Sequence, residues 1–339
     1  MLEWSSRVGH MQRREFISLL GGAAVAWPRA TAALDNRKLY RIGYLGAEAA
    51  YRGRHGLVSE MEKLGYVEGK DFIIEWRFAD LKHERLLGLA LELVELNVDV
   101  IVAATGRAVK EAQHATRDIP IVMAVNDDPV RMGLVTSLAR PGGNTTGLSA
   151  ANNETLPKQL ELLNFVVPNL SRIGYLVNPI SADPENPYLS NIPLSLDAAA
   201  QALKLTIQRA VVLDPSDLER AFVAMENGHV QAAVIAGGPL LNPLQRRVAE
   251  LALAYKLPSI AQRREYAEVG LLMSYGESRS EFWRRTAYFV DKILKGAEPA
   301  HLPVELPTRF NLVINLRSAK TLGITIPAQL LTTADDLLE

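Results

Sequence analysis

The pentapeptide Arg-Ile-Gly-Tyr-Leu occurs twice in this chain, at Arg41–Leu45 and again at Arg172–Leu176. The apolar run Val98–Gly106 is answered at nearly the same spacing by Val230–Gly238. Similar segments that recur in the same order predict two halves built on one structural plan. Few folds are compatible with such a repeat in a chain of this length.

Each half alternates short apolar segments with amphipathic segments, which is typical of a parallel sheet covered by helices. In the first half we expect strands at 40–46, 71–78, 98–103, 119–125 and 146–150, and helices at 52–64, 83–96 and 107–117. In the second half we expect strands at 172–177, 232–236, 259–261 and 310–314, and helices at 194–203, 216–227, 243–255, 279–295 and 316–322. Capping boxes at Ser216/Glu219 and Ser278/Glu281 are expected to open two of these helices. The sequence therefore predicts an α/β fold of two Rossmann-like lobes.

The chain is expected to cross between the lobes three times, near Ser149, Ser274–Gly276 and Thr308–Phe310. The first lobe then comprises 39–148 and 276–308, and the second comprises 149–275 and 309–339. Three crossings form a hinge, and two lobes on a hinge can close around a ligand. We expect that ligand at the carboxyl ends of the parallel strands, where α/β sheets bind their ligands.

Composition narrows the functional classes. The formal net charge is −1 and no basic stripe is present, which argues against nucleic acid as the main partner. The chain has no cysteine, so disulfides, cysteine-ligated metals and thiol nucleophiles are excluded. It has no Gly-x-Ser-x-Gly, His-Glu-x-x-His or phosphate-loop motif, which argues against an enzyme. The five histidines after residue 32 lack metal-ligand spacing and are expected at the surface: His55, His83, His114, His229 and His301.

Residues 1–32 have the features of an export signal. Arg13 and Arg14 precede an apolar stretch over 16–27, and Ala30 and Ala32 form an Ala-x-Ala cleavage pattern. The apolar stretch, about 12 residues, is too short for a bilayer span of about 20. The paired arginines resemble a twin-arginine signal, with a general secretory signal as the alternative. We therefore expect a periplasmic protein.

Six further segments carry a family resemblance: Gly65–Gly69, Asn126–Val130, Arg140–Asn144, Gly270–Gly276, Pro303–Ile314 and Leu322–Pro327. With these motifs in order, residues 39–339 resemble the ABC-transporter substrate-binding proteins of the TrpX type. The resemblance implies a type I periplasmic-binding-protein fold and delivery of a small solute to a membrane permease. Characterised relatives in this family bind aromatic amino acids.

Loops after the strands of the first lobe supply the first candidate ligand contacts. Ala47 and Glu48 follow the first strand, and Thr105 follows the third. A ligand carboxylate could approach backbone N–H groups at the helix start after Thr105, whose hydroxyl adds a donor. The alternative is that Gly106 only permits a tight turn. Phe78, which ends the second strand, could stack on an aromatic solute or pack in the core.

Two carboxylates follow the fourth strand, in the segment Asn126-Asp127-Asp128-Pro129. A buried carboxylate there could receive the ammonium group of a ligand. Asp128 directly before Pro129 suits a helix N-cap, so we expect Asp127 to bind the ligand. The family usually has one aspartate before the proline, which leaves the choice between Asn126 and Asp127 open.

The remaining candidates lie at strand ends of the second lobe or at the crossings: Ser149, Asn178, Gly237, Gly238, Arg264 and Tyr275. Arg264 could bind a carboxylate through its two-pronged guanidinium, with an intralobe salt bridge as the alternative. Tyr275 could close over a ligand or merely pack.

Taken with the resemblance, these residues predict a non-enzymatic receptor that captures an amino acid or aromatic acid and delivers it to ABC permease subunits. A ligand-sensing component of a signalling system with the same fold is the alternative. We expect a monomer that uses no metal and no cofactor.

Overall fold

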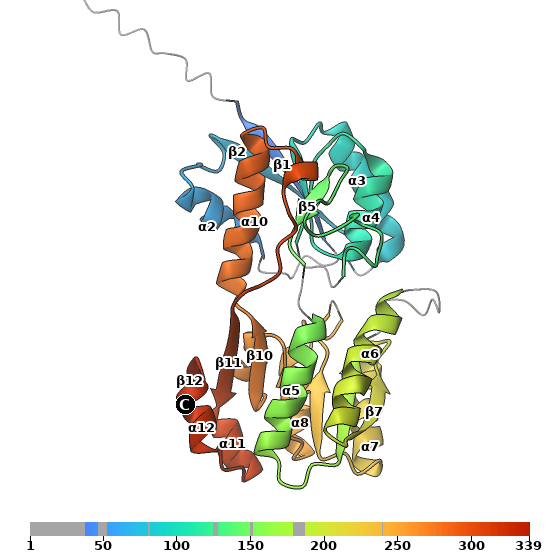
Figure 1. Ribbon diagram of the computed structural model, residues 1–339, viewed down its shortest axis with the longest axis vertical. Helices are drawn as coiled ribbons and strands as arrows, with labels where there is room; N and C mark the ends of the chain where they lie inside the picture. The colour runs from blue at the N-terminus through green and yellow to red at the C-terminus, as the bar shows by residue number, and fades with distance from the viewer. Residues whose placement is uncertain are drawn as a thin grey trace, which may run out of the picture. The chain divides into compact units, whose positions relative to one another are not determined.

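Two mainly parallel sheets organise the protein, as the computed structural model shows (Figure 1). The structure describes residues 38–46, 53–80, 82–124, 128–149, 152–178, 187–238 and 240–339. Residues 39–339 form one compact unit, distinct from 1–38. No helix in the described ranges is long and apolar enough to cross a membrane.

The first sheet has the strand order β2-β1-β3-β4-β5, and every neighbouring pair is parallel. Its strands are β1 (Tyr40–Gly46), β2 (Phe72–Phe78), β3 (Val100–Ala103), β4 (Ile121–Met123) and β5 (Thr145–Gly147). Its helices are α2 (Gly53–Lys63), α3 (Leu86–Glu95), α4 (Gly106–Ala115) and α10 (Arg279–Leu294), with the 3₁₀ turns η1 (His83–Arg85) and η3 (Pro299–His301). One apolar cluster joins the sheet to α3 and α4, and another joins it to α2 and α10. Burial of both faces explains why the central strands are almost wholly apolar.

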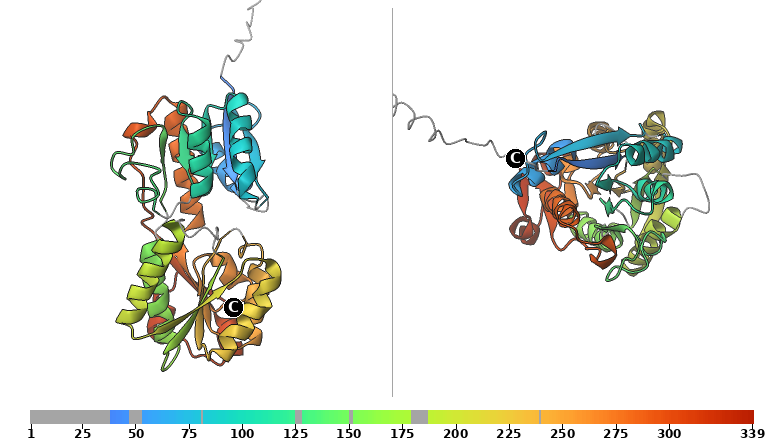
Figure 2. Two further views of the ribbon diagram at one scale, coloured as in Figure 1. Left: turned by 90° about the vertical axis from the view of Figure 1, so that its right-hand side faces the viewer. Right: turned by 90° about the horizontal axis from the view of Figure 1, so that it is seen from above.

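The second sheet has the order β12-β11-β10-β9-β8-β6-β7, parallel except where β10 meets β11. Its strands are β6 (Arg172–Val177), β7 (Thr206–Val211), β8 (Ala232–Ile235), β9 (Ser259–Ala261), β10 (Met273–Glu277), β11 (Phe310–Asn315) and β12 (Asp336–Leu338). Its helices are α5 (Asn152–Val166), α6 (Pro187–Ala202), η2 (Pro215–Asp217), α7 (Leu218–Asn227), α8 (Gln245–Ala254), α9 (Arg264–Glu268), α11 (Leu316–Leu322) and α12 (Ala328–Thr333). Helices cover both of its faces, as Figure 2 shows in its left view.

The internal repeat predicted from the sequence is confirmed by the strand pairing. The two copies of the pentapeptide lie in β1 and β6, and each strand occupies the same place in its sheet. β1 pairs with β2 and β3, and β6 pairs with β7 and β8. The order β2-β1-β3-β4 thus recurs as β7-β6-β8-β9.

Three connections join the two sheets: from β5 to α5, from β10 to α10, and from η3 to β11. Backbone hydrogen bonds tie two of them together, because the Glu305 N–H donates to the Gly147 carbonyl and the Ser149 N–H donates to the Glu305 carbonyl, both at 2.9 Å. β10 stays in the second sheet as far as Glu277, one residue beyond the crossing range predicted from the sequence. The lobe boundaries themselves stay a prediction.

Two family-like motifs have structural roles in the first lobe. The Tyr66 hydroxyl donates to buried Asp291 of α10 at 2.9 Å, which fastens the loop before β2 to that helix. The Asn144 amide donates to the carbonyls of Thr116 and Ile119, which fastens the turn before β5 to the end of α4. These contacts explain the motifs through packing rather than through ligand binding.

Seven elements of the described structure were not predicted from the sequence: α5, β7, α9, β10, η3, α12 and β12. α6 begins at Pro187 rather than at 194, so Pro193 lies inside this helix instead of before it. Pro187 is the first helical residue, a position that tolerates proline. The predicted Ser216/Glu219 capping box is wrong: Asp214 caps η2, and Asp217 completes the box. Ser278 is the N-cap of α10 by position but makes no side-chain capping bond.

Candidate functional site

The carboxyl ends of the parallel strands form one edge of each sheet. In the first sheet, β1, β2 and β3 end together at this edge, where the Ala79 N–H donates to the Gly46 carbonyl and the Ala104 N–H donates to the Leu45 carbonyl. In the second sheet, the corresponding loops follow Val177 and the ends of β8 and β9. Ala47, Glu48, Asn126 and Asp127 lie outside the described residues, and their ligand contacts stay predictions.

Thr105 is the N-cap of α4. Its side-chain oxygen accepts a hydrogen bond from the Ala108 N–H at 3.1 Å, and the residue is partly exposed. A hydroxyl can accept and donate at once, so its proton stays available to a ligand while the cap is formed. The first turn of α4 adds N–H groups and a dipole that favour negative charge. Capping and ligand donation are therefore compatible roles for this residue.

The helix N-cap expected at Asp128 is wrong, because turns and not a helix follow it; its carboxylate accepts from the Arg131 N–H at 3.0 Å within such a turn. The ligand contact predicted for Asp127 or Asn126 does not compete with this hydrogen bond, because it involves a different side chain.

Phe78 belongs to an aromatic cluster at the same edge of the first sheet. Its ring stacks on Trp76 with centroids 6.0 Å apart and lies 5.8 Å from Tyr44. Both Trp76 and Phe78 are only partly buried, whereas Tyr44 is buried. The cluster thus packs into the core and also presents apolar surface at the strand ends. Core packing of Phe78 is therefore compatible with stacking on an aromatic solute.

His83 is half-buried, and the surface position expected for it is wrong. It lies in η1, shortly after β2, and its Nδ1 atom is buried with no hydrogen-bond partner among the described residues. Burial, reinforced by the positive charge of Arg107, lowers the pKa of His83 below its ordinary value. No sequence pattern indicates this burial, because a lone histidine at the start of a helix has no distinguishing spacing.

Acid is expected to destabilise the protein through His83. Because its folded-state pKa is depressed, the unfolded chain takes up the proton first, and stability is lost as pH falls through the unfolded value of about 6.5. His83→Gln should reduce the loss of unfolding free energy between pH 7 and pH 5, measured by urea denaturation. His301→Gln is the control, because the His301 side chain is 79% exposed. An undiminished pH effect in His83→Gln would contradict this assignment.

In the second lobe, Asn178 is already partly engaged. Its amide donates to the Val212 carbonyl at 2.7 Å, which ties the end of β6 to the end of β7. Its Oδ1 is not used by any described residue, so a ligand N–H could still donate to it.

The two hinge candidates have structural contacts. Ser149 is 3% exposed, and its backbone N–H donates to the Glu305 carbonyl. Tyr275 stacks on Phe310 with centroids 5.9 Å apart, and the Gln159 side chain donates to the Tyr275 carbonyl at 2.8 Å. Both residues hold crossing segments in place, and ligand contact by either stays a prediction.

Arg264 forms salt bridges within the second lobe, which is the alternative to binding a ligand carboxylate. Its guanidinium donates to Glu268 at 2.7 Å and to Asp336 of β12. These carboxylates raise the pKa of Arg264 and satisfy its charge. An arginine already held by two carboxylates has little left to offer a ligand carboxylate, so the ligand role is not favoured.

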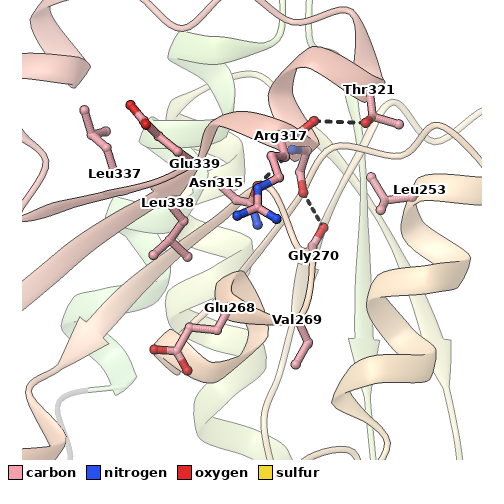
Figure 3. A pocket seen from close by; sticks show the side chains of 11 residues that line it. Leu253, Glu268, Val269, Gly270, Asn315, Arg317, Thr321, Leu337, Leu338 and Glu339 are labelled. Carbon is pink, nitrogen blue, oxygen red and sulfur yellow. Dashed lines mark hydrogen bonds between the residues drawn. The ribbon is translucent and has the colours of Figure 1, made fainter.

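A solvent-open hollow of about 490 Å³ lies elsewhere in the second lobe, where β10 begins and β11 ends (Figure 3). It is therefore at the opposite edge of the sheet from the carboxyl ends of the parallel strands. The polar side chains here bond within the lobe: Asn315 donates to the Ala267 carbonyl, and Ser318 donates to the Gly270 carbonyl. We assign this hollow to packing around the C-terminus and not to the ligand site. The described residues also contain no group of three or more His, Cys, Asp or Glu side chains suited to a metal.

Comparisons with known proteins find a matching family model and similar proteins. A sequence profile described as ABC transporter substrate binding protein matches residues 42–338. The tyrosine-binding protein of Clostridioides difficile strain R20291 is 25% identical over 274 residues, covering 80% of this chain and 77% of that protein.

Two solved structures share the fold along their full lengths. The ABC domain in complex with L-Trp from Streptococcus pneumonia has a TM-score of 0.79 and 26% identity, covering 89% of this chain and 100% of that chain. A conserved domain protein from Vibrio cholerae O1 biovar El Tor has a TM-score of 0.80 and 28% identity, covering 88% of this chain and 100% of that chain. The two-lobed α/β architecture is thus the type I periplasmic-binding-protein fold predicted from the sequence.

Proposed function

Because this chain belongs to the ABC transporter substrate binding protein family, we propose that it captures a small organic solute between its lobes and delivers it to an ABC permease. Members of this family bind solutes and are not enzymes. The proposal places the protein in the periplasm after removal of residues 1–32. A twin-arginine signal is the proposed route, with the general secretory route as the alternative.

We propose an aromatic amino acid or aromatic acid as the solute. The proteins that resemble this chain include a tyrosine-binding protein and a domain solved with L-Trp. The observation that carries the proposal is the pairing of Thr105 and the α4 N-terminus with the Tyr44–Trp76–Phe78 cluster at one edge of the first sheet. The two features pack on opposite faces of this sheet, α4 in one apolar cluster and the three aromatic rings in the other, so a solute would meet both only beyond the strand ends. An aromatic carboxylate could reach both.

Apolar contact alone does not account for useful affinity. Burying an aromatic side chain of about 150–250 Å² contributes roughly 4–6 kcal/mol at about 25 cal/mol per Å². Micromolar binding needs about 8 kcal/mol after the entropy cost of association is overcome. The charged or polar groups of the solute must therefore be paired as well. Thr105 and the α4 amides suit a carboxylate, and Asp127 suits an ammonium group.

A thermal-shift screen of the mature protein tests the proposal against the twenty amino acids and a set of aromatic carboxylates. L-tryptophan, L-tyrosine or an aromatic acid is expected to raise the melting temperature in a concentration-dependent way, because a ligand that binds only the folded state stabilises it. Aliphatic amino acids of similar charge are the matched controls. No shift with any compound would contradict the proposed substrate class.

A sensing role with the same fold is the second candidate. It would require the same ligand binding but a different partner, so pull-down of the liganded protein with solubilised membranes distinguishes the two. Recovery of ABC permease subunits supports transport, and recovery of a membrane histidine kinase supports sensing.

A further inference from the structure

Asn242 lies above the ends of two neighbouring central strands in the second sheet. It is in the turn between β8 and α8, and its backbone N–H donates to the Gly238 carbonyl at 2.9 Å. Its Oδ1 atom lies 3.2 Å from the point where a Cβ on Gly237 would be. Ile235 and Ala261 are paired where β8 and β9 end, so this amide is at the carboxyl edge of the sheet.

Tyr266 holds the oxygen side of this amide. Its side chain is fully buried, and its hydroxyl donates to Asn242 Oδ1 at 3.4 Å. The distance is long for a bond between two oxygens, so the tyrosine orients the amide without immobilising it. Tyr266 comes from α9, after β9, so two different strand-end loops converge on one amide.

The nitrogen side of the amide remains unused. No described residue accepts a hydrogen bond from Asn242 Nδ2, and the residue is only partly buried. An amide nitrogen carries two donor hydrogens. An oriented, accessible N–H₂ group at the carboxyl edge of a parallel sheet has the chemistry to bind an oxygen atom of a ligand.

We propose that Asn242 contacts the solute from the second lobe by donating from Nδ2 to a ligand oxygen, and that Tyr266 is the residue that positions its amide. Gly237 also matters for this contact, because a side chain at this position would displace the amide oxygen of Asn242. The inference rests on the proposed solute-binding function and adds a specificity-determining contact to it.

Asn242→Asp tests the contact, using the amino acid or aromatic acid with the largest thermal shift in the panel of twenty amino acids and aromatic carboxylates. The aspartate can still accept from Tyr266 but has no donor for the ligand and repels a carboxylate. We expect at least 10-fold weaker binding by titration calorimetry, and a smaller loss for Asn242→Ala. Asn227→Asp, at the exposed end of α7, is the matched control and should bind like the wild type.

Tyr266→Phe tests the positioning role through a double-mutant cycle. It should weaken binding about 3–10-fold in the wild-type background and have no further effect when Asn242 is already alanine. A merely structural tyrosine would weaken binding equally in both backgrounds. Tyr255→Phe, in the same lobe next to Phe222, is the matched control.

The outcomes separate this inference from the function on which it depends. If the wild type binds a solute and both Asn242 variants bind it equally well, the contact is refuted and the function stands. If the wild type binds no compound in the panel, the proposed substrate class and this contact are refuted together. Equal losses from Tyr266→Phe in both backgrounds would refute the positioning role alone.

Discussion

Gly147→Ala is expected to destabilise the protein by about 2–5 kcal/mol. Gly147 ends β5 with a φ of 129°, and a Cβ there would lie 2.4 Å from the Met123 carbonyl oxygen. The clash is with backbone of the neighbouring strand, which cannot rotate away. The estimate adds about 1–3 kcal/mol for overpacking to about 1–2 kcal/mol for a left-handed conformation. Urea denaturation followed by circular dichroism measures the loss.

Gly143→Ala is the matched control for this effect. Gly143 also has a positive φ, 63°, but nothing lies within 4 Å of its Cβ position. It should lose only the conformational part, about 1–2 kcal/mol. If both substitutions lowered the free energy of unfolding equally, close packing of β5 on β4 would not be the reason that position 147 requires glycine.

Thr105→Val is expected to weaken solute binding about 10–100-fold and to lower stability by about 1 kcal/mol. The first effect is the loss of a hydrogen bond to a charged ligand group, worth about 1.5–3 kcal/mol. The second is the loss of the α4 cap. Titration calorimetry and urea denaturation separate the two. Thr105→Ser keeps the hydroxyl and should restore both.

Asn315→Ala shows whether a lost cap by itself affects binding. Asn315 caps α11 by accepting from the Ser318 N–H at 2.9 Å, at the edge of the second sheet away from the proposed site. This variant should be less stable but bind the solute with unchanged affinity. If Thr105→Val also keeps wild-type affinity, Thr105 is a cap and not a ligand contact.

The repeat made the architecture predictable from the sequence. Arg41 is the second residue of β1 and Arg172 the first of β6, and these apolar strands are visible in the sequence because both of their faces are buried. β7 was missed because it is an edge strand, largely exposed on one side, whose Arg209 and Gln208 bond to Asp197 and the Ala224 carbonyl. Its polar content hid the strand pattern.

Local capping chemistry was predictable only in part. The spacing Ser216/Glu219 fits a capping box, but Asp214 followed by Pro215 fits one too, and the proline at the first helical position decides for Asp214. α5 was missed because Pro157 interrupts an otherwise helical segment. Proline thus points to the correct cap in one case and conceals a helix in the other, because Pro157 lies inside α5.

The sequence predicts the location of the candidate site in the fold better than it predicts which residues form the site. Thr105 could be found because it directly follows a strongly apolar strand. Asn242 could not, because its role depends on Tyr266, which is 24 residues away in a helix too short to have a periodic pattern. Arg264 suits a ligand carboxylate by residue type, but Asp336, in a strand that the sequence did not predict, binds it.

A crystal structure of the protein with its best-binding aromatic solute tests the central claim most directly. The account predicts one solute molecule in contact with both lobes, with a carboxylate or other oxygen within hydrogen-bond distance of Thr105 and a second polar contact from Asn242. A solute bound to one lobe alone, or in the hollow beside Arg317 and Glu268, would contradict it.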